Sequence, residues 1–351
     1  MQYPMLEWLR CPVTKTPLRL EVLTEFEKQY TKKNIKEIKD GLLFSEAGFI
    51  FPIIDGIPRM LVETVYDYKD FLESRLPGYA EVKKNLEEKY GELLKACARR
   101  NKKTKKTFEF EWSFLNTKKK DRIWQASVDE MQLVFLKETG QSADFYKNSI
   151  VIDIGAGHGV MTRKIAEIAS LAIGVEISKA VENAYANNTN PNAWYLQADL
   201  QYLPFADLSF DSLYSSGVIH HTPNTEHSLS LIEKSLKPGG NICLWLYHPQ
   251  KNILHNLSLQ LRKITSLLPL WLSLFFLSVF VFPFTFIIKS IRRKKAPNYR
   301  EEMIDLLDTF TPEYRFEIPE EEAIEWLEKR NYREVTITTT NQFGFSITGI
   351  K

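Results

Sequence analysis

From about residue 145 to the last residue, apolar runs of strand length alternate with amphipathic stretches of helical period. The runs lie in the segments 149–160, 171–178, 193–200, 210–224 and 236–248. Strands that alternate with helices in this way are typical of a parallel sheet with helices on both faces. The pattern predicts an α/β domain over residues 145–351.

Two other patterns precede this domain. Residues 1–62 contain short apolar runs separated by prolines and glycines, which predicts a small β-rich unit. Residues 63–144 have a helical and charged pattern, and we expect a helical linker and lid region there. The basic run "RRNKKTKK", residues 99–106, is interpreted as a solvated part of that linker.

Composition adds limits on location and partners. The chain of 351 residues has a formal net charge of +2, so its overall charge gives no reason to expect a nucleic-acid partner. The three cysteines, Cys11, Cys97 and Cys243, are odd in number and far apart, unlike a secreted disulfide framework. The first residues do not follow the pattern of a secretory signal. We therefore expect a cytoplasmic protein.

The segment "SIVIDIGAGHGV", residues 149–160, carries the first chemical signal. An apolar strand ends in a glycine-rich turn, and a helical pattern follows. Glycines allow the backbone to approach a ligand, and a helix N-terminus offers free N–H groups to anionic atoms. A dinucleotide fingerprint would need a third glycine where this chain has Val160, which disfavours nicotinamide and flavin cofactors. The turn implies a nucleotide-like ligand, although turns of this kind also use glycine for steric reasons alone.

Polar residues end the strands that follow. Glu176 ends the second strand, and its carboxylate can accept hydrogen bonds from two ribose hydroxyls. Asp199 ends the third strand, and Ser215, Ser216 and Gly217 end the fourth. Because the carboxyl ends of parallel strands face one crevice, we expect these residues to line one ligand site. Taken singly, each acidic residue fits a helix cap or turn equally well.

Together these motifs resemble class I S-adenosylmethionine-dependent methyltransferases, specifically the branch similar to ubiquinone/menaquinone-biosynthesis methyltransferases. The resemblance extends over residues 108–350. It implies a Rossmann-like, seven-stranded, mostly parallel sheet whose last strand is antiparallel, with "YREVTITTT" and "FGFSITGI" as the final pair. The segment "FEFEW", with Phe110 and Trp112, resembles part of a lid. The implied cofactor is S-adenosyl-L-methionine, bound by Asp153, Gly155, Ala156, Gly157, His158, Gly159, Glu176, Ile177, Asp199, Leu200, Ser216 and Gly217.

Catalysis of this kind needs few groups from the protein. The sulfonium is already an activated methyl donor, so alignment of the acceptor with the methyl group supplies most of the acceleration. A base is needed only for a hydroxyl or an acidic carbon. The candidates are His220 and His221 after the fourth strand, and Tyr247 and His248 after the fifth. The alternative, that both histidines only shape the floor of the pocket, stays open.

The N-terminal unit resembles the small zinc-ribbon-like domain of methyltransferase activator subunits, through "LEWLRCPVTKTPLRL" and "GLLFSEAGFIFPIIDGIPRML". By this resemblance, cysteines belong at four positions where the chain has Cys11, Thr14, Phe44 and Ala47. One thiolate cannot form a tetrahedral zinc site, which takes about four ligands. We therefore expect no metal in this unit, and Cys11 as a small buried hydrophobic residue.

The segment 264–288 has 25 uncharged residues between two lysines, and one bilayer crossing takes about 20 residues. A single crossing would, however, put the last two strands on the opposite side of the membrane from the rest of the sheet. Pro269 and Pro283 are expected to divide the segment into shorter pieces. We predict a hydrophobic helical insertion over residues 254–295 that contacts the inner membrane face peripherally or covers an apolar substrate. The alternative is a helix buried in the core or in a dimer contact.

The sequence thus predicts a methyltransferase that acts on an O, C or N atom of a small metabolite, with lipophilic metabolites included. The alternative is a non-catalytic, methyltransferase-like subunit that supports a partner protein. Glu176 and Asp199 beside a glycine-rich turn favour the enzyme, because a scaffold has no chemical need for them. A macromolecular substrate is a third reading, based on the lysine runs at 102–106 and 118–120. The acceptor and the oligomeric state are left open.

Overall fold

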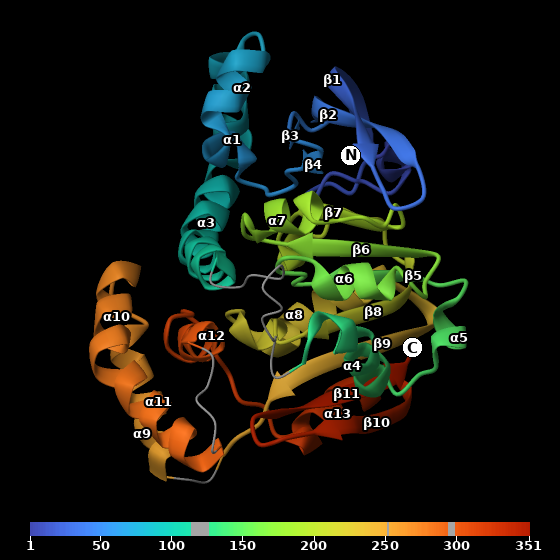
Figure 1. The fold of residues 1–351 in the computed structure, drawn as a ribbon. Helices are drawn as coiled ribbons and strands as arrows, with labels where there is room; N and C mark the ends of the chain where they lie inside the picture. Colours follow the sequence, from blue (N-terminus) through green and yellow to red (C-terminus); the bar gives the residue numbers. More distant parts are fainter. Residues whose placement is uncertain (114–125, 251–252, 294–298) are drawn as a thin grey trace.

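The computed structural model describes residues 1–113, 126–250, 253–293 and 299–351. They form two β-sheets, a long helix beside them, and a group of helices that stands next to the larger sheet (Figure 1). The larger sheet positions the candidate site, and the other parts close around one of its edges.

The larger sheet has seven strands in the order β10-β11-β9-β8-β5-β6-β7. Its neighbouring parallel strands are β5 (Ile150–Ile154), β6 (Leu171–Glu176), β7 (Ala193–Gln197), β8 (Phe210–Ser216) and β9 (Leu236–Tyr247). Strand β11 (Gly344–Ile350) pairs antiparallel with β9 and with β10 (Arg333–Thr340). The predicted fold class, a mostly parallel sheet with an antiparallel last strand, is confirmed.

Both faces of this sheet are covered. Because successive side chains of a strand point to opposite faces, Ile152 and Ile173 lie in one hydrophobic core, while Val151 and Ala172 lie in another. The helices whose apolar residues join the second core are α4 (Met131–Thr139), α5 (Ala143–Tyr146), α6 (Val160–Ile165) and α7 (Ala180–Ala186). Helices α8 (Thr225–Ile232) and α13 (Glu320–Glu328) join the first. Burial on both faces explains why the parallel strands are continuously apolar.

The N-terminal unit is the predicted β-rich unit. It is an antiparallel sheet of β1 (Leu18–Gln29), β2 (Asn34–Ser45), β3 (Ile50–Ile54) and β4 (Ile57–Pro58), in that order. Just after β4, Arg59 forms a bridge with Gln197 at the end of β7, and the Met60 amide donates to the Gln197 carbonyl at 2.7 Å. Its apolar residues share one hydrophobic core with the larger sheet. Cys11 is fully buried, as expected.

The chain leaves the N-terminal sheet through α1 (Thr64–Asp67), α2 (Lys69–Arg75) and α3 (Tyr79–Ser113). The run 99–106 lies inside α3, so the interpretation of this run as a solvated linker was wrong. Arg100 and Lys105 point to one side of the helix, where buried carboxylates pair with them, whereas Lys102 and Lys106 are exposed. A run of like charge therefore has one solvated face and one buried face.

The predicted insertion is a helical hairpin. Helix α9 (Ile253–Thr265) is followed by one continuous helix made of α10 (Leu270–Phe276), the π-helical turn η7 (Leu277–Val281) and α11 (Phe282–Arg293). Pro269 precedes this helix, as expected, but the prediction that Pro283 interrupts it was wrong. A proline lacks the N–H donor and crowds the carbonyl four residues earlier, and the wider turn before Pro283 accommodates both effects.

The hairpin packs on the fold through one side only. Leu277, Val281 and Phe282 contact Leu306 and Phe310 of α12 (Tyr299–Phe310), which lies between the hairpin and the larger sheet (Figure 1). Within the described residues, Leu270–Ile287 is the one helical stretch long and apolar enough to cross a membrane, and only 11% of it is buried. Most of its side chains therefore face away from the fold.

Candidate functional site

A cavity of about 890 Å³, counting the space open to solvent, lies at the carboxyl ends of the parallel strands. Helix α3 covers it along one side, and Asp308 at the end of α12 closes another. Most of the predicted polar strand ends converge here, as expected from the shared edge of a parallel sheet. The predicted cofactor residues that line it are Gly155, Glu176, Ile177, Asp199, Leu200, Ser216 and Gly217.

The glycine-rich turn after β5 is packed too tightly for side chains. Gly155 and Gly157 have φ angles of 83° and 53°, in the left-handed region that favours glycine. A Cβ atom on Gly155 would lie 2.2 Å from the Val218 side chain, and one on Gly157 would lie 2.6 Å from the Trp112 ring. Backbone angle and space both require glycine here, and the chain can approach a ligand closely.

Glu176 ties the end of β6 to this turn. The Gly157 amide donates to its Oε2 at 2.9 Å, and the Ser178 amide donates to its Oε1 at 2.8 Å. Burial raises the pKa of the Glu176 carboxyl, while the hydrogen bonds from Ser178 and Gly157 act in the opposite direction. Each carboxylate oxygen can accept more than one hydrogen bond, so acceptor capacity remains for ligand hydroxyls.

A second cavity, of about 400 Å³, lies beside the glycine-rich turn. Asp153, Gly155, Ala156, His158 and Ser216 line it, so the predicted cofactor residues divide between two neighbouring cavities. The predicted residues Gly157 and Gly159 line neither cavity and act through the backbone: Gly157 as described above, Gly159 as the N-cap of α6.

Two buried groups in this second cavity have shifted pKa values. Burial raises the pKa of Asp153 to about 7, although Thr162 donates a hydrogen bond to it at 2.5 Å. Burial, with a smaller contribution from Arg163, lowers the pKa of His158 to about 3, and its ring lies 4.8 Å from that of Trp112. His158 is therefore neutral at physiological pH. The aromatic segment that was predicted to form a lid thus contacts the glycine-rich turn.

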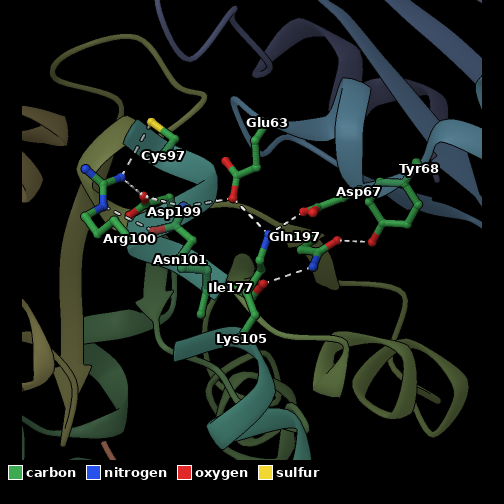
Figure 2. A network of polar contacts seen from close by, with 10 residues as sticks. All are labelled: Glu63, Asp67, Tyr68, Cys97, Arg100, Asn101, Lys105, Ile177, Gln197 and Asp199. Atoms are coloured by element: carbon green, nitrogen blue, oxygen red, sulfur yellow. Dashed lines mark hydrogen bonds and ion pairs between the residues drawn. The ribbon is translucent and has the colours of Figure 1, made fainter. Parts of the chain in front are cut away.

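Asp199 has a partner that the sequence did not reveal (Figure 2). The Arg100 guanidinium forms an ion pair with it, and the Asn101 side chain donates to it at 3.1 Å. The Asn101 amide also donates to Glu63 at 3.0 Å, and Lys105 pairs with Glu63 at 2.9 Å. A chain of contacts thus joins α3, the end of the N-terminal unit and the strand end of β7. In the sequence, only the spacing of polar residues within the basic run 99–106 could have indicated these contacts.

His221 is held by two acceptors. Its Nδ1 lies 2.9 Å from the Tyr314 carbonyl oxygen, and its Nε2 lies 3.2 Å from Asp308 Oδ1. A carbonyl oxygen can only accept, so Nδ1 carries a proton and donates it to Tyr314, while Nε2 lies within ion-pair distance of the Asp308 carboxylate. Burial would raise the pKa of Asp308, but His221, Tyr247 and Arg315 outweigh it and hold that pKa below its usual range. His221 and Asp308 therefore lie as a close pair at the cavity wall.

Two of the other three catalytic candidates, Tyr247 and His220, lie behind this pair. The Tyr247 hydroxyl donates to Asp308, and its ring lies 4.5 Å from the His220 ring. His220 is fully buried, and neither of its ring nitrogens has a hydrogen-bond partner within the part of the chain that the structure describes. Burial, then His221 and Arg315, lowers the pKa of His220 well below its usual value. His220 and Tyr247 therefore contact His221 and Asp308 and help to hold that pair in place.

Sequence reasoning missed two acidic residues of the cavity wall. Asp308 follows the insertion and reaches the site through α12, and Glu111 stands in "FEFEW", of which only the aromatic residues were considered. No group of three His, Cys, Asp or Glu side chains that could hold a metal ion occurs among the described residues.

Residues 152–244 match the family described as "Methyltransferase domain". The chain is 31% identical over 118 residues to phosphoethanolamine N-methyltransferase 2 of Caenorhabditis elegans. The aligned stretch covers 32% of this chain and 27% of that protein. It is 28% identical over 116 residues to the ubiquinone/menaquinone biosynthesis C-methyltransferase of Saccharophagus degradans, covering 30% of this chain and 45% of that one. The chain thus spans less than half the length of either relative.

A similar fold occurs in the crystal structure of an S-adenosylmethionine-dependent methyltransferase from Aquifex aeolicus. The TM-score is 0.39 and the sequence identity 14%, over 67% of this chain and 98% of that one.

Proposed function

Because residues 152–244 form a class I S-adenosylmethionine-dependent methyltransferase domain, we propose that this protein transfers the methyl group of S-adenosylmethionine to a small molecule held in the 890 Å³ cavity. The observation that carries the proposal is the placement of Glu176 and the glycine-rich turn at the wall of that cavity. Nucleotide-like ligands bind at this edge of open α/β sheets.

In this proposal, Glu176 holds the ribose of the cofactor. The glycine-rich turn, with Asp153 and His158 beside it, surrounds the methionyl part. Asp199 and Leu200 lie next to the adenine, with Ile177 between adenine and ribose, and Ser216 and Gly217 close over the cofactor from the end of β8. When bound, S-adenosylmethionine supplies an activated methyl group.

The protein's own contribution is then placement. Phe108 and Trp112 of α3 cover the cavity, exclude water and limit the positions open to an acceptor. We propose that the pair of His221 and Asp308 lies nearest the acceptor. Since both nitrogens of His221 face acceptors, it orients the acceptor and does not act as a free base.

We also propose that the acceptor is a small metabolite with an apolar body and that the hairpin 254–295 brings the protein to a membrane surface as a peripheral protein. The support is the exposed apolar side of Leu270–Ile287 together with the largely apolar wall of the cavity. The N-terminal unit is proposed as a metal-free support that packs on the β7 edge.

The test is methyl transfer itself. Purified protein is incubated with methyl-labelled S-adenosylmethionine and a crude metabolite extract, which is then partitioned between water and an organic solvent. Transfer of label to a new compound that depends on Glu176 supports the proposal, and label in the organic phase supports an apolar acceptor. Binding of S-adenosylmethionine without transfer from any extract would favour the alternative, a non-catalytic subunit.

A further inference from the structure

The wall of the cavity is acidic. The charged residues that line it are four carboxylates and two basic side chains: Glu111, Glu176, Asp199 and Asp308 with Arg100 and His221. Three of the carboxylates have partners: backbone amides for Glu176, Arg100 for Asp199, and His221 for Asp308. The fourth, Glu111, is the exception.

Glu111 is a buried acid with no counter-ion among the described residues. It is 2% exposed, it lines the cavity, and its Oε2 has no hydrogen-bond partner in residues 1–113, 126–250, 253–293 or 299–351. Burial, then the charges of Asp308, Glu176 and Asp305, raises its pKa well above the usual value. An unpaired buried carboxyl is destabilising, so its presence at a cavity wall calls for a ligand that satisfies it.

Aromatic rings flank this carboxyl. Phe108 and Trp112 lie three residues before and one residue after Glu111, on the side of α3 that faces the cavity, and Tyr314 lines the same cavity. The Phe108 ring lies 5.6 Å from the ring of His221. Aromatic faces together with a carboxylate form a wall that binds cations with an apolar body.

We propose that the methyl acceptor of this site is an amine with an apolar body, and that the Glu111 carboxylate binds its N–H. This assignment rests on the proposed methyl transfer and names the substrate class of the same site. The ammonium of the bound acceptor favours the ionised form of Glu111, because an opposite charge nearby stabilises a carboxylate, and it then gives one N–H proton to Glu111 Oε2. The free nitrogen pair then forms the N–CH₃ bond, the S–CH₃ bond breaks with its electrons on sulfur, and S-adenosylhomocysteine and a methylated ammonium result.

The charge of the site fits this acceptor better than the alternatives. S-adenosylmethionine carries a sulfonium, an ammonium and one carboxylate, so it neutralises only part of the acidic wall. A carboxylate acceptor would add repulsion beside Glu111 and Asp308. An alcohol brings no cation and would leave Glu111 as a buried acid without a counter-ion among the described residues.

The test uses two cofactor analogues that differ at the position of the methyl group. Sinefungin carries a protonated amine there, whereas S-adenosylhomocysteine has a neutral sulfur. Their affinities for the full chain are measured by titration calorimetry for wild type, Glu111→Gln and Glu109→Gln. Glu109 is exposed on the same helix and provides the matched control.

For Glu111→Gln we expect at least about a ten-fold loss of sinefungin affinity, about 1.4 kcal/mol, because the substitution removes a charge-assisted hydrogen bond. S-adenosylhomocysteine affinity should change less than about three-fold, which also reports that the variant is folded. Glu109→Gln should change neither. An equal loss for both analogues would place Glu111 at a shared part of the cofactor and overturn the proposal, as would an unchanged affinity ratio. If wild type binds neither analogue, it is the proposed function that fails.

Discussion

Glu176 joins two parts of the candidate cofactor site, because its carboxylate accepts amide hydrogens from both Gly157 and Ser178. Its removal would free the glycine-rich turn and, in the proposed site, also delete the acceptor for the ribose. At the scale of single residues, this carboxylate is the strongest point of the cofactor assignment.

We predict that Glu176→Ala weakens S-adenosylmethionine binding about ten-fold or more, since hydrogen bonds to a charged group contribute 1.5–3 kcal/mol. Gly157→Val should weaken it too, because the added side chain would collide with Trp112. Calorimetric titration measures both, with the exposed Glu167→Ala as control. Unchanged affinity in the first two variants would show that the site is assigned wrongly.

A second residue-scale prediction concerns pH. Burial raises the pKa of Glu138 to about 7, with opposing hydrogen bonds from Tyr214 and Ser216. In the unfolded chain this group loses its proton near pH 4.5, so between pH 4.5 and about 7 the folded state binds more protons. The free energy of unfolding therefore falls as pH rises through this range, by about 3 kcal/mol for this group.

Glu138→Gln removes that titration but keeps an acceptor for the Tyr214 hydroxyl. Denaturant unfolding at pH 5 and pH 8 should show a smaller loss of stability in this variant than in wild type. The exposed Glu167→Gln should behave like wild type. An equal loss in Glu138→Gln and wild type would mean that Glu138 is ionised in the folded protein at both pH values.

At the scale of elements, α3 closes the site by means of ion pairs. Arg100 and Asn101 contact Asp199, and Asn101 and Lys105 contact Glu63, so the helix connects the N-terminal unit to the edge of the larger sheet (Figure 2). The ends of this network are buried, so breaking it leaves a carboxylate without its cation.

We predict that Arg100→Ala lowers the free energy of unfolding by roughly 1–3 kcal/mol, less than for a fully buried pair because Arg100 is partly exposed. Lys102→Ala, from the exposed face of the same basic run, should have almost no effect. Urea denaturation of both variants and of wild type measures these differences in the free energy of unfolding. Equal stability of all three would mean that α3 is held by its apolar contacts alone.

The sequence predicted those elements that are encoded by residues close to one another in the chain. The alternation of apolar runs gave the parallel strands, and the glycine-rich turn and Glu176 stand directly at strand ends, so their positions follow from the pattern. Pro283 shows the limit of such reasoning, because a π-helical turn before it keeps the helix continuous.

The missed residues reach the site through tertiary structure. Asp308 comes to the cavity only because α12 packs between the hairpin and the sheet, and Glu111 and Arg100 only because α3 runs along the cavity. No local spacing encodes such placements. The basic run around Arg100 was misinterpreted for the same reason, since its buried partners lie far away in the sequence.

At the scale of the whole molecule, the hairpin and the candidate acceptor site share α12. Leu306 and Phe310 pack on the hairpin, while Asp308 on the same helix pairs with His221 in the cavity. Two side-chain hydrogen bonds fix α9 to the end of α12. Arg262 donates to the Pro312 carbonyl at 2.7 Å, just after α12, and Thr265 donates to the carbonyl of Phe310, the last residue of α12, at 2.9 Å. A surface that binds the hairpin would therefore lie close to the acceptor site.

The chemistry of the hairpin region fits an anionic lipid surface. Large apolar side chains are exposed along it, among them Trp271 at 70%, Phe275 at 59% and Phe280 at 61%. Residues 249–300 contain no Asp or Glu but nine basic residues: Lys251, Arg262, Lys263, Lys289, Arg292, Arg293, Lys294, Lys295 and Arg300. Apolar residues that enter the interface and basic residues that attract anionic headgroups act together in peripheral membrane binding.

We predict that the full-length protein floats with vesicles that contain phosphatidylglycerol, and much less with pure phosphatidylcholine, in a density gradient. The triple variant Trp271→Glu, Phe275→Glu, Phe280→Glu should stay at the bottom, because it removes exposed apolar area without touching the side packed on α12. Leu133→Glu with Leu208→Glu changes exposed apolar residues elsewhere and should float like wild type. Flotation of the triple variant, or none of wild type, would show that the exposed face of the hairpin does not bind lipid.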